Sequence, residues 1–428
     1  MRKIKLKKQN IFIILNVTII FIITIFYASR LIHYYKIDNP KIKEQETLYK
    51  LLTLKKNVVT AGNGLYQDKN NFFYKGQIDN NYVKYSGRLF RVVSLNKNSV
   101  KMITEENQTS LVWGIDHTYE ESYINNWLNK KDNINDTGIF CNSLNNFGNY
   151  VDNISNVNIN LLTKKEYELS INKTSYLNNG KDWWLKDSKT YVEASGKIGD
   201  KISSGNSYYS YGVRPVIDIK SDIVILKGNG AVDNPYIFEN IVNNVLNSKN
   251  IGDYLVYNNL TFRIIDKNND YTKIVLDGFI KNDDKDLVMK YGTVSNIYSL
   301  NSGIGYYLNN TWINTLDKKY LVKGNINTNR YDSTVDYNYL KINDITINAY
   351  VGLLNIGDFF IYDYNDYFLG TRTSTYTKTV YKVTDKGKIY DDLITSVSKV
   401  RPVIFINKDV IVKTGNGLKN DPYILGEL

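Results

Sequence analysis

The sequence predicts an α+β protein that is mainly β, with two tandem domains of one kind behind an N-terminal transmembrane helix. The first observation behind this prediction is a set of motifs that recur in one order, about 180 residues apart. The second is the short alternation of apolar and polar residues within these motifs, which is typical of β-strands. The third is an uncharged apolar stretch that lies ahead of both copies.

The apolar stretch covers residues 11–28 (IFIILNVTIIFIITIFYA) and contains no charged residue. As a helix rising about 1.5 Å per residue it would span roughly 27 Å, close to the thickness of a hydrocarbon core. Residues 1–10 carry five basic side chains, which predicts a cytoplasmic tail and an extracytoplasmic location for residues 29–428. The stretch is longer than the core of a signal peptide, and FYA at 26–28 is a poor cleavage site. We therefore favour an uncleaved signal anchor in the lipid bilayer over a cleaved signal peptide.

Residues 29–57 are predicted to form a juxtamembrane stalk. Within them, leucines 48, 51, 52 and 54 are spaced to give a short helix one apolar side. This helix either binds a partner helix or serves as a solvated spacer, and we favour the spacer.

The positive charge of the chain is concentrated ahead of its folded part. Residues 1–57 contain 12 Lys or Arg against 3 Asp or Glu, whereas the remaining residues contain 42 against 40. Nucleic-acid binding requires clustered basic residues on the folded body. The charge distribution therefore predicts no nucleic-acid partner.

The duplication is clearest where each copy ends. Residues 213–237 (VRPVIDIKSDIVILKGNGAVDNPYI) and 400–424 (VRPVIFINKDVIVKTGNGLKNDPYI) are identical at 13 of 25 positions. Further motifs recur in the same order: YVKY…RLFRVV (82–93) with YLVY…LTFRII (254–265), YINNWLN (123–129) with YLNNTWIN (307–314), paired leucines (161–162 with 353–354), and DWWL (182–185) with DYFL (366–369). The period is too long for a solenoid. Each copy is therefore expected to be a domain, the first over residues 58–240 and the second over residues 241–428.

The motifs also predict local structure. Two hairpins are expected, each from two apolar runs that flank turn residues: 90–95 with 100–103, and 262–266 with 273–276. Ile124, Trp127 and Leu128 fall on one face of a short helix. Each Gly-Asn-Gly triplet is expected to turn the chain through positive φ angles.

The ordered motifs resemble a family of bacterial cell-surface domains that are described as lectin-like and have no assigned function. The resemblance rests on these segments: GNGLY (62–66), NYVKYSGRLFRVV (81–93), YINNWLN (123–129), VRPVI (213–217), and GNG with PYI (228–237). The second copy lacks only the opening GNGLY, so the resemblance covers nearly everything after residue 57. It implies a C-type-lectin-like fold, shared with the formylglycine-generating enzyme, and an extracytoplasmic setting. It implies no ligand, because one fold hosts many functions.

Catalytic residues are not expected. Oxidative catalysis of the formylglycine-generating kind would need paired cysteines, and Cys141 is the single cysteine. A thiol nucleophile would need a positioned base, and nothing in the sequence ties Cys141 to His117. Because cysteine and histidine are so few in this sequence, a His/Cys zinc site is not expected either. An envelope-polymer hydrolase with paired carboxylates stays open as an alternative, because Asp and Glu are abundant.

No cofactor is expected, although calcium stays open because some lectin-like folds bind it. Residues 132–136 (DNIND) are rich in oxygen ligands but lack the EF-hand spacing. The Glu-Pro-Asn, Gln-Pro-Asp and Trp-Asn-Asp triplets typical of calcium-binding lectins are missing.

Two matched aromatic pairs are the candidates for a binding surface: Trp183 and Trp184 in the first copy, Tyr367 and Phe368 in the second. Neighbouring residues on a strand face opposite ways, so one residue of each pair can be exposed and can stack on a sugar ring.

A second set of recurring residues is interpreted as a structural signature. The arginines of this set can form a phosphate or carboxylate clamp, or they can be buried and donate to loop carbonyls, and we favour burial. Trp127 and Trp312 are expected in the cores, and each X-Pro step at the start or edge of a strand. The whole signature comprises Arg91, Trp127, Arg214, Pro215, Arg263, Trp312, Arg401 and Pro402.

The sequence therefore leads us to expect a membrane-anchored, extracytoplasmic binding or adhesion protein without catalytic activity. Its ligand (carbohydrate, peptide or protein) is not identified, and a structural or assembly role in the cell envelope is the further alternative. A binding site is expected in the loops where the two copies differ.

Overall fold

The computed structural model describes residues 46–114, 118–129, 138–151, 159–199, 210–239, 244–328, 330–331, 345–373, 378–384 and 387–426. Of these residues, 39% are in strands and 13% in helices, which confirms a mainly β protein. The predicted transmembrane segment (11–28), His117 and residues 132–136 lie outside the described residues. Within the described ranges, no helix is long and apolar enough to cross a membrane. Residues Thr47–Leu428 form one compact unit.

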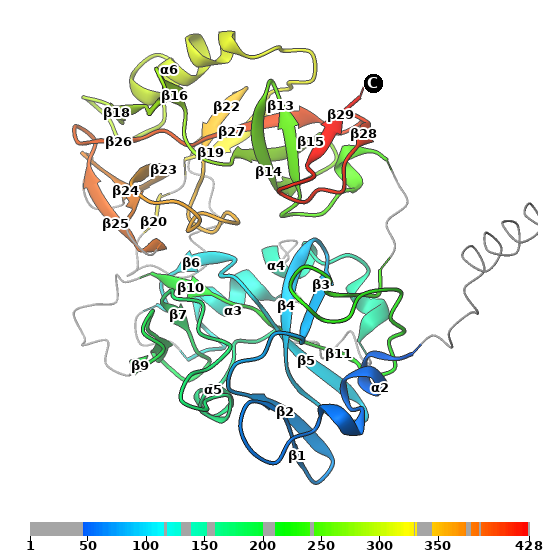
Figure 1. Cartoon of the computed structure of the whole chain (residues 1–428). Coiled ribbons are helices and arrows are strands. Elements are labelled where there is room, and N and C mark those ends of the chain that lie inside the picture. Colours follow the sequence, from blue (N-terminus) through cyan, green and yellow to red (C-terminus); the bar gives the residue numbers. More distant parts are fainter. Residues whose placement is uncertain are drawn as a thin grey trace, which may run out of the picture. The chain divides into compact units, whose positions relative to one another are not determined.

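The first copy is built around a mainly antiparallel sheet whose centre is the predicted hairpin (Figure 1). The hairpin strands are β4 (Arg88–Leu95) and β5 (Ser99–Thr104). The other strands of this sheet are β1 (Gly64–Asp68), β2 (Asn71–Lys75), β3 (Tyr82–Tyr85), β11 (Val216–Lys220) and β12 (Tyr236–Ile237).

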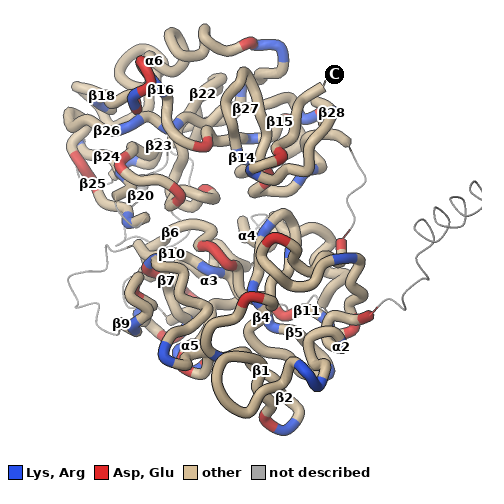
Figure 2. The backbone as a smooth tube through the Cα atoms, viewed as in Figure 1, with Lys and Arg blue, Asp and Glu red and all other residues tan. Residues whose placement is uncertain are grey.

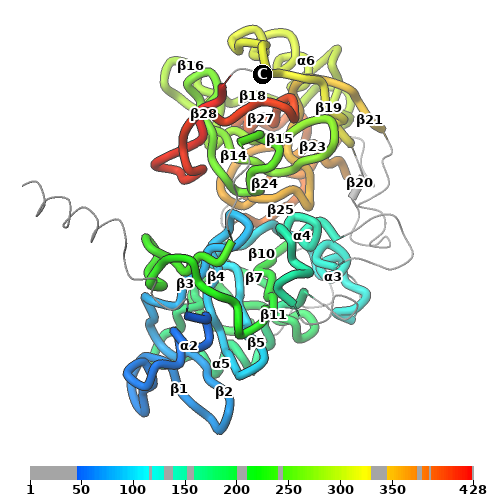
Figure 3. Tube along the Cα trace, turned by 90° about the vertical axis from the view of Figure 1, so that its right-hand side faces the viewer, coloured from blue at the N-terminus to red at the C-terminus, as the bar shows by residue number. Residues whose placement is uncertain are grey.

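The second copy repeats this sheet. Its strands, in sheet order, are β22 (Val351–Leu353), β27 (Pro402–Asn407), β15 (Tyr271–Leu276), β14 (Leu260–Lys267), β13 (Tyr254–Tyr257), β29 (Tyr423–Leu425) and β28 (Val412–Thr414). The β13–β14–β15–β27 pairing has the connectivity of β3–β4–β5–β11 in the first copy. Figure 3 shows β14, β15 and β27 side by side. The hairpin predicted for this copy is confirmed by the pairing of β14 with β15.

A second sheet in each copy follows the same plan. In the first copy it contains β6 (Thr109–Leu111), β10 (Tyr211–Val213), β7 (Trp183–Trp184), β8 (Tyr191–Val192) and β9 (Ile198–Gly199). In the second copy it contains β18 (Val288–Lys290), β26 (Val397–Lys399), β23 (Tyr367–Thr373), β24 (Thr379–Val383), β25 (Ile389–Leu393) and β20 (Arg330–Tyr331). Each of these two sheets has a parallel strand contact at the matching position. Trp183 pairs with Gly212 in the first copy, and Tyr367 pairs with Lys399 in the second.

Two smaller ribbons complete the strands described in the second copy. They pair β16 (Lys281–Asn282) with β17 (Lys285–Asp286), and β19 (Gly324–Asn327) with β21 (Thr346–Ala349).

Short helices accompany the sheets. The predicted helix of the first copy is α3 (Tyr123–Leu128), where Ser122 caps the start by accepting from the Asn125 N–H. Its counterpart is split: α6 (Gly303–Asn310) ends before Thr311, the residue inserted in this copy, and the 3-10 helix η5 (Trp312–Thr315) follows. Three further short helices of the first copy are α4 (Ile139–Asn142), η2 (Phe147–Tyr150) and α5 (Lys164–Leu169).

The Gly-Asn-Gly turn closes each copy on its own first strand. The Tyr82 N–H donates to the Gly230 carbonyl, and the Tyr254 N–H donates to the Gly417 carbonyl. The strand after each turn then pairs in parallel with that first strand, β12 with β3 and β29 with β13. The prediction of positive φ angles at these glycines is confirmed. The motif therefore joins the end of each copy to its beginning.

The end of the predicted stalk belongs to the folded body. α2 (Leu48–Leu52) is followed by η1 (Lys55–Asn57), and Leu48 and Leu52 are buried. The Leu48 N–H donates to the Ile223 carbonyl at 2.8 Å. The second copy starts in the same way, because η4 (Leu246–Ser248) begins with a bond from the Leu246 N–H to the Val410 carbonyl. The expectation of a solvated spacer is therefore wrong for residues 48–52, whose apolar side packs into the body.

Candidate functional site

The aromatic pairs expected at the surface are buried. Trp183, Trp184 and Tyr367 are 0% exposed and Phe368 is 1% exposed, so the prediction that one residue of each pair is exposed is wrong. The physical reason is that β7 and β23 are inner strands of their sheets and are covered on both faces. The Trp184 indole N–H donates to the Leu111 carbonyl at 2.7 Å. These rings therefore cannot stack on a ligand in solvent.

The arginines before the prolines donate to backbone carbonyls inside each copy. Arg214 and Arg401 are 0% exposed. Their Nε groups donate to the Thr104 and Leu276 carbonyls, at 2.9 and 3.1 Å, where β5 and β15 end. Their Nη1 groups donate to the carbonyls of Leu177 and Phe360. This arrangement holds a loop against a strand, and burial keeps both guanidinium groups out of reach of an external anion.

The remaining residues of the predicted structural signature are buried or half-buried. Arg91 lies between the rings of Tyr82 and Tyr176, and Arg263 pairs with Asp363 at 2.7 Å. Buried positions are taken by Trp127, Trp312, Pro215 and Pro402. Pro402 is the first residue of β27, the place in a strand that proline tolerates.

The thiol of Cys141 is half-buried in α4. Across the described part of the chain, no group of three or more His, Cys, Asp or Glu side chains is placed to hold a metal ion.

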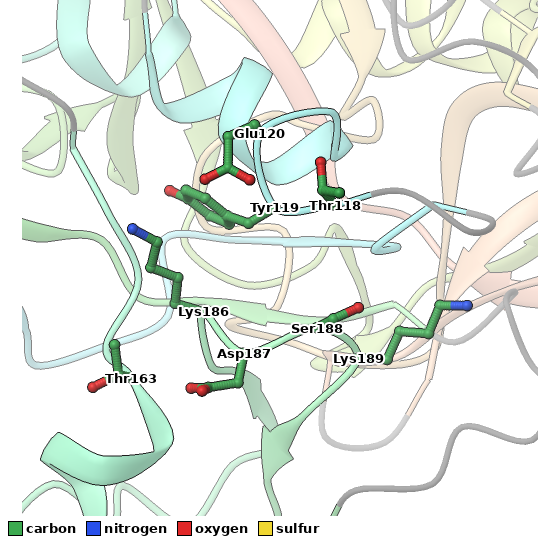
Figure 4. A pocket seen from close by; sticks show the side chains of 8 residues that line it. All are labelled: Thr118, Tyr119, Glu120, Thr163, Lys186, Asp187, Ser188 and Lys189. Atoms are coloured by element: carbon green, nitrogen blue, oxygen red, sulfur yellow. The ribbon is translucent and has the colours of Figure 1, made fainter.

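One polar hollow lies on the first copy and has a volume of about 660 Å³ (Figure 4). It is lined by a loop ahead of α3, by the cap of α5 and by the turn after β7: Thr118, Tyr119, Glu120, Thr163, Lys186, Asp187, Ser188 and Lys189. Figure 4 shows Lys186 beside Tyr119, whose ring lies 5.1 Å from the ammonium, and Lys189 pointing away. The two lysines and the two carboxylates that line this hollow balance in charge.

A second hollow, of about 760 Å³, lies on the sheet of β23–β26 and is here called the lysine hollow. It is lined by Asn365, Asp366, Lys382, Thr384, Lys388, Tyr390 and Lys399. Lys382 on β24 lies opposite Tyr390 on β25, and Lys399 ends β26. These strands and the turn between β24 and β25 therefore bring the three lysines, which are close in sequence, to one hollow.

Each lysine of the lysine hollow is held by a carboxylate. Lys382 lies 2.6 Å from Asp366 and 3.7 Å from Asp392, Lys399 lies 3.2 Å from Asp286, and Lys388 lies 3.3 Å from Asp182. Burial lowers the pKa of Lys382, but its hydrogen bond to Asp366 and the nearby negative charges outweigh this and raise the pKa above its usual value. The lysine therefore stays an ammonium throughout the physiological range.

Three lysines and one carboxylate, Asp366, line the hollow, whereas the other carboxylates that pair with these lysines lie outside the lining. The side chain of Asp366 is 49% exposed, so water screens its attraction for Lys382. Tyr390 is 45% exposed and offers an aromatic surface at the rim. These groups suit an anionic ligand that also carries hydroxyl or ring surfaces. Elsewhere along the described chain, basic and acidic residues are interspersed (Figure 2).

A third hollow, of about 240 Å³, shares Lys388 with the lysine hollow and is here called the acidic hollow. Its lining adds Asp182, Tyr191, Glu193, Ala194, Ser195 and Tyr211. Tyr191 and Tyr211 stack with their centroids 4.3 Å apart. Sequence reasoning placed Asp182 in a recurring motif but predicted none of these lining residues as part of a site.

The lysine hollow has no counterpart in the first copy. By strand pairing, Lys382 and Tyr390 match Tyr191 and Gly199, and Lys399 matches Gly212. The signal for the site was therefore a difference between the copies, visible only once the strand register was known. Comparisons with protein-family models, with curated proteins and with solved structures found no match for this chain.

Proposed function

We propose that this chain is a membrane-anchored, extracytoplasmic binding protein with two tandem lectin-like domains. The anchor is the uncharged stretch of residues 11–28, and the basic residues ahead of it favour a cytoplasmic N-terminus. The repeated sheet plan supports a tandem duplication of one domain.

Orientation has a direct test. Protease added to intact cells is expected to digest residues 46–428 and to leave residues 1–10 protected. Protection of the folded body against protease would contradict the proposed orientation.

The ligand class that we propose is an anionic, hydroxyl-bearing polymer of the cell envelope. The observation behind this proposal is the lysine hollow, where three ammonium groups line one open depression together with an exposed tyrosine. An ammonium has three N–H donors, and a partly solvated carboxylate such as Asp366 is a weak competitor for them. The phosphate or carboxylate groups of a polymer would bind these donors while its hydroxyl groups contact Asn365 and Thr384.

Binding is favoured over hydrolysis because two of the carboxylates that line the adjoining hollows are already paired with lysines. Asp366 and Asp182 each form a salt bridge with a lysine. A carboxylate that acts as general acid or base must reach the substrate, whereas these two side chains are engaged by lysines of the protein itself.

The full chain in detergent micelles tests this proposal on an array of acidic and neutral polysaccharides, with and without calcium. We expect binding to the acidic members, weakened about fivefold by Lys382→Gln and more by the double change with Lys399→Gln, because each ammonium contributes up to about 1 kcal/mol. Lys227→Gln, an exposed lysine of the first copy, is the matched control and should bind as the wild type does. Equal binding of neutral and acidic polysaccharides, or unchanged affinity of the double variant, would contradict the proposed ligand class.

A further inference from the structure

The lysine hollow and the acidic hollow adjoin at Lys388 and differ in the charged groups that line them. The lysine hollow is lined by three lysines and one carboxylate, whereas the acidic hollow is lined by Asp182, Glu193 and the shared Lys388. A ligand that extends through both hollows would therefore meet mainly ammonium donors in the first and carboxylates in the second.

The acidic hollow has the chemistry of a cation site. The ammonium of Lys388 already lies there, 3.3 Å from the Asp182 carboxylate and 5.4 Å from the centre of the Tyr211 ring. Carboxylates and the faces of aromatic rings are the groups that stabilise ammonium ions in proteins. Asp182 is fixed in place because its Oδ1 also accepts from the Ala194 N–H at 2.7 Å.

Glu193 is the carboxylate of the acidic hollow that can meet a ligand. It is half-buried, and its Oε2 accepts from the Ser195 hydroxyl at 3.1 Å on the turn between β8 and β9. Its partner is a neutral hydroxyl, whereas the carboxylate of Asp182 is held by Lys388. An ammonium group of a ligand would therefore gain a charge-assisted bond at Glu193 without displacing a lysine.

We propose that the ligand is a zwitterionic polymer, with an anionic group bound by Lys382, Lys388 and Lys399 and an adjacent ammonium group bound at Glu193. This inference rests on the proposed binding function and deepens it by assigning the second charge of the ligand. Lys388 lies at the boundary, so it contacts the anionic group on one side and Asp182 on the other.

The test compares three defined polymers on the full chain in detergent micelles, at a pH where amines are protonated. O-carboxymethyl chitosan carries both carboxylate and ammonium groups, its N-acetylated derivative carries only the carboxylate, and chitosan carries only the ammonium. We expect the zwitterionic polymer to bind about fivefold more tightly than the N-acetylated derivative, since one solvent-accessible ion pair contributes up to about that factor. Chitosan is expected to bind most weakly, because the lysine hollow repels it.

The variant Glu193→Gln tests whether Glu193 binds the ammonium group of the zwitterionic polymer. It should remove the preference for the zwitterionic polymer and leave affinity for the N-acetylated derivative unchanged. Glu168→Gln, an exposed acidic residue on α5, is the control and should keep the preference, and equal unfolding midpoints would show that both variants fold. Equal or tighter binding of the N-acetylated derivative, or a preference that survives Glu193→Gln, would overturn the zwitterion proposal and leave anion binding intact. If neither carboxylated polymer bound, anion binding itself would be overturned as well.

Discussion

The buried arginines of the two copies act as fixed cross-links between a strand end and a loop. Arg401 is fully buried, and its guanidinium donates to the carbonyls of Leu276 and Phe360 while lying 4.6 Å from the Tyr364 ring centre. Each carbonyl also accepts from a backbone N–H, Leu276 from Gly278 and Phe360 from Asp363, so a shorter neutral side chain would remove the charged donor and leave one weaker partner at each carbonyl. Arg214 has the same role in the first copy.

Replacement of Arg401 tests this role. Arg401→Ala is expected to lower the free energy of unfolding by about 3 kcal/mol, because it removes two buried hydrogen bonds from a charged donor, each contributing about 1.5–3 kcal/mol. Urea unfolding of residues 46–428, followed by tryptophan fluorescence, measures the change. Lys408→Ala is the control, since this lysine is 41% exposed and pairs only with Asp409, and its effect should stay within about 0.5 kcal/mol. A loss at Arg401 no larger than that of the control would contradict the structural role.

Sequence reasoning was useful for these arginines and failed for the neighbouring aromatic rings. An arginine before proline at the same place in both copies indicates a shared structural task. Strand alternation indicates which way Trp183 and Trp184 point relative to each other, but it does not show that both faces of β7 are covered. Burial of both rings depends on packing against Tyr167 on one side and Trp113 on the other, which are distant in sequence.

At the scale of elements, the closing turns depend on glycine for two separate reasons. Gly415 has a φ of +96°, and a Cβ atom there would lie 2.1 Å from the Pro422 carbonyl oxygen. Gly228 repeats this geometry, with 1.9 Å to the Pro235 carbonyl oxygen. Positive φ strains any other residue, and the close approach of a backbone atom adds a clash that a side-chain rotation cannot relieve.

The two causes can be separated by comparing two glycines. Gly180 has a φ of +73° and nothing within 4 Å of its Cβ position, so Gly180→Ala should cost only the strain of about 1 kcal/mol. Gly415→Ala should cost that amount and a further 1–3 kcal/mol, roughly, for overpacking. Thermal unfolding of both variants measures the difference. Equal costs would mean that β29 moves freely away from the turn.

The strand register explains why the candidate site could not be predicted while much of the fold could. The hairpins and α3 follow from local patterns of apolar residues, turn residues and a capping serine. The lysine hollow follows from the pairing of Lys382 with Tyr390 and from the arrival of Lys399 on β26 beside β23. The lysines themselves are close in sequence, but the sequence alone gives neither the register of β24 against β25 nor the parallel contact of β26 with β23.

At the scale of the whole molecule, the folded body begins earlier than the sequence indicated. The predicted boundary at residue 58 would separate α2 from the sheet that it packs against. Leu48 and Leu52 are 0% and 1% exposed, and Thr47 forms a bridge with Val224. The equivalent start of the second copy, at Val245 and Leu246, makes the same contacts with Ile411 and Val410.

Two fragments test this boundary. Residues 46–428 should unfold with the stability of the full body, whereas residues 58–428 should lose several kcal/mol, because deleting one buried leucine side chain costs about 2–5 kcal/mol. Urea midpoints of the two fragments give the comparison, and the double variant Leu48→Ala with Leu52→Ala in the longer fragment separates the leucines from the rest of α2. A shorter fragment as stable as the longer one would restore the boundary at residue 58.

The pairing of each last strand with its own first strand also sets an order for folding during synthesis. β3 cannot gain its partner β12 until residue 237 has been synthesised, so the first copy stays incomplete until then. Once β12 is available, the first copy has every strand of its main sheet while the second is still being made. The chain would thus fold one copy at a time, which limits mispairing between two copies that share so many strand sequences.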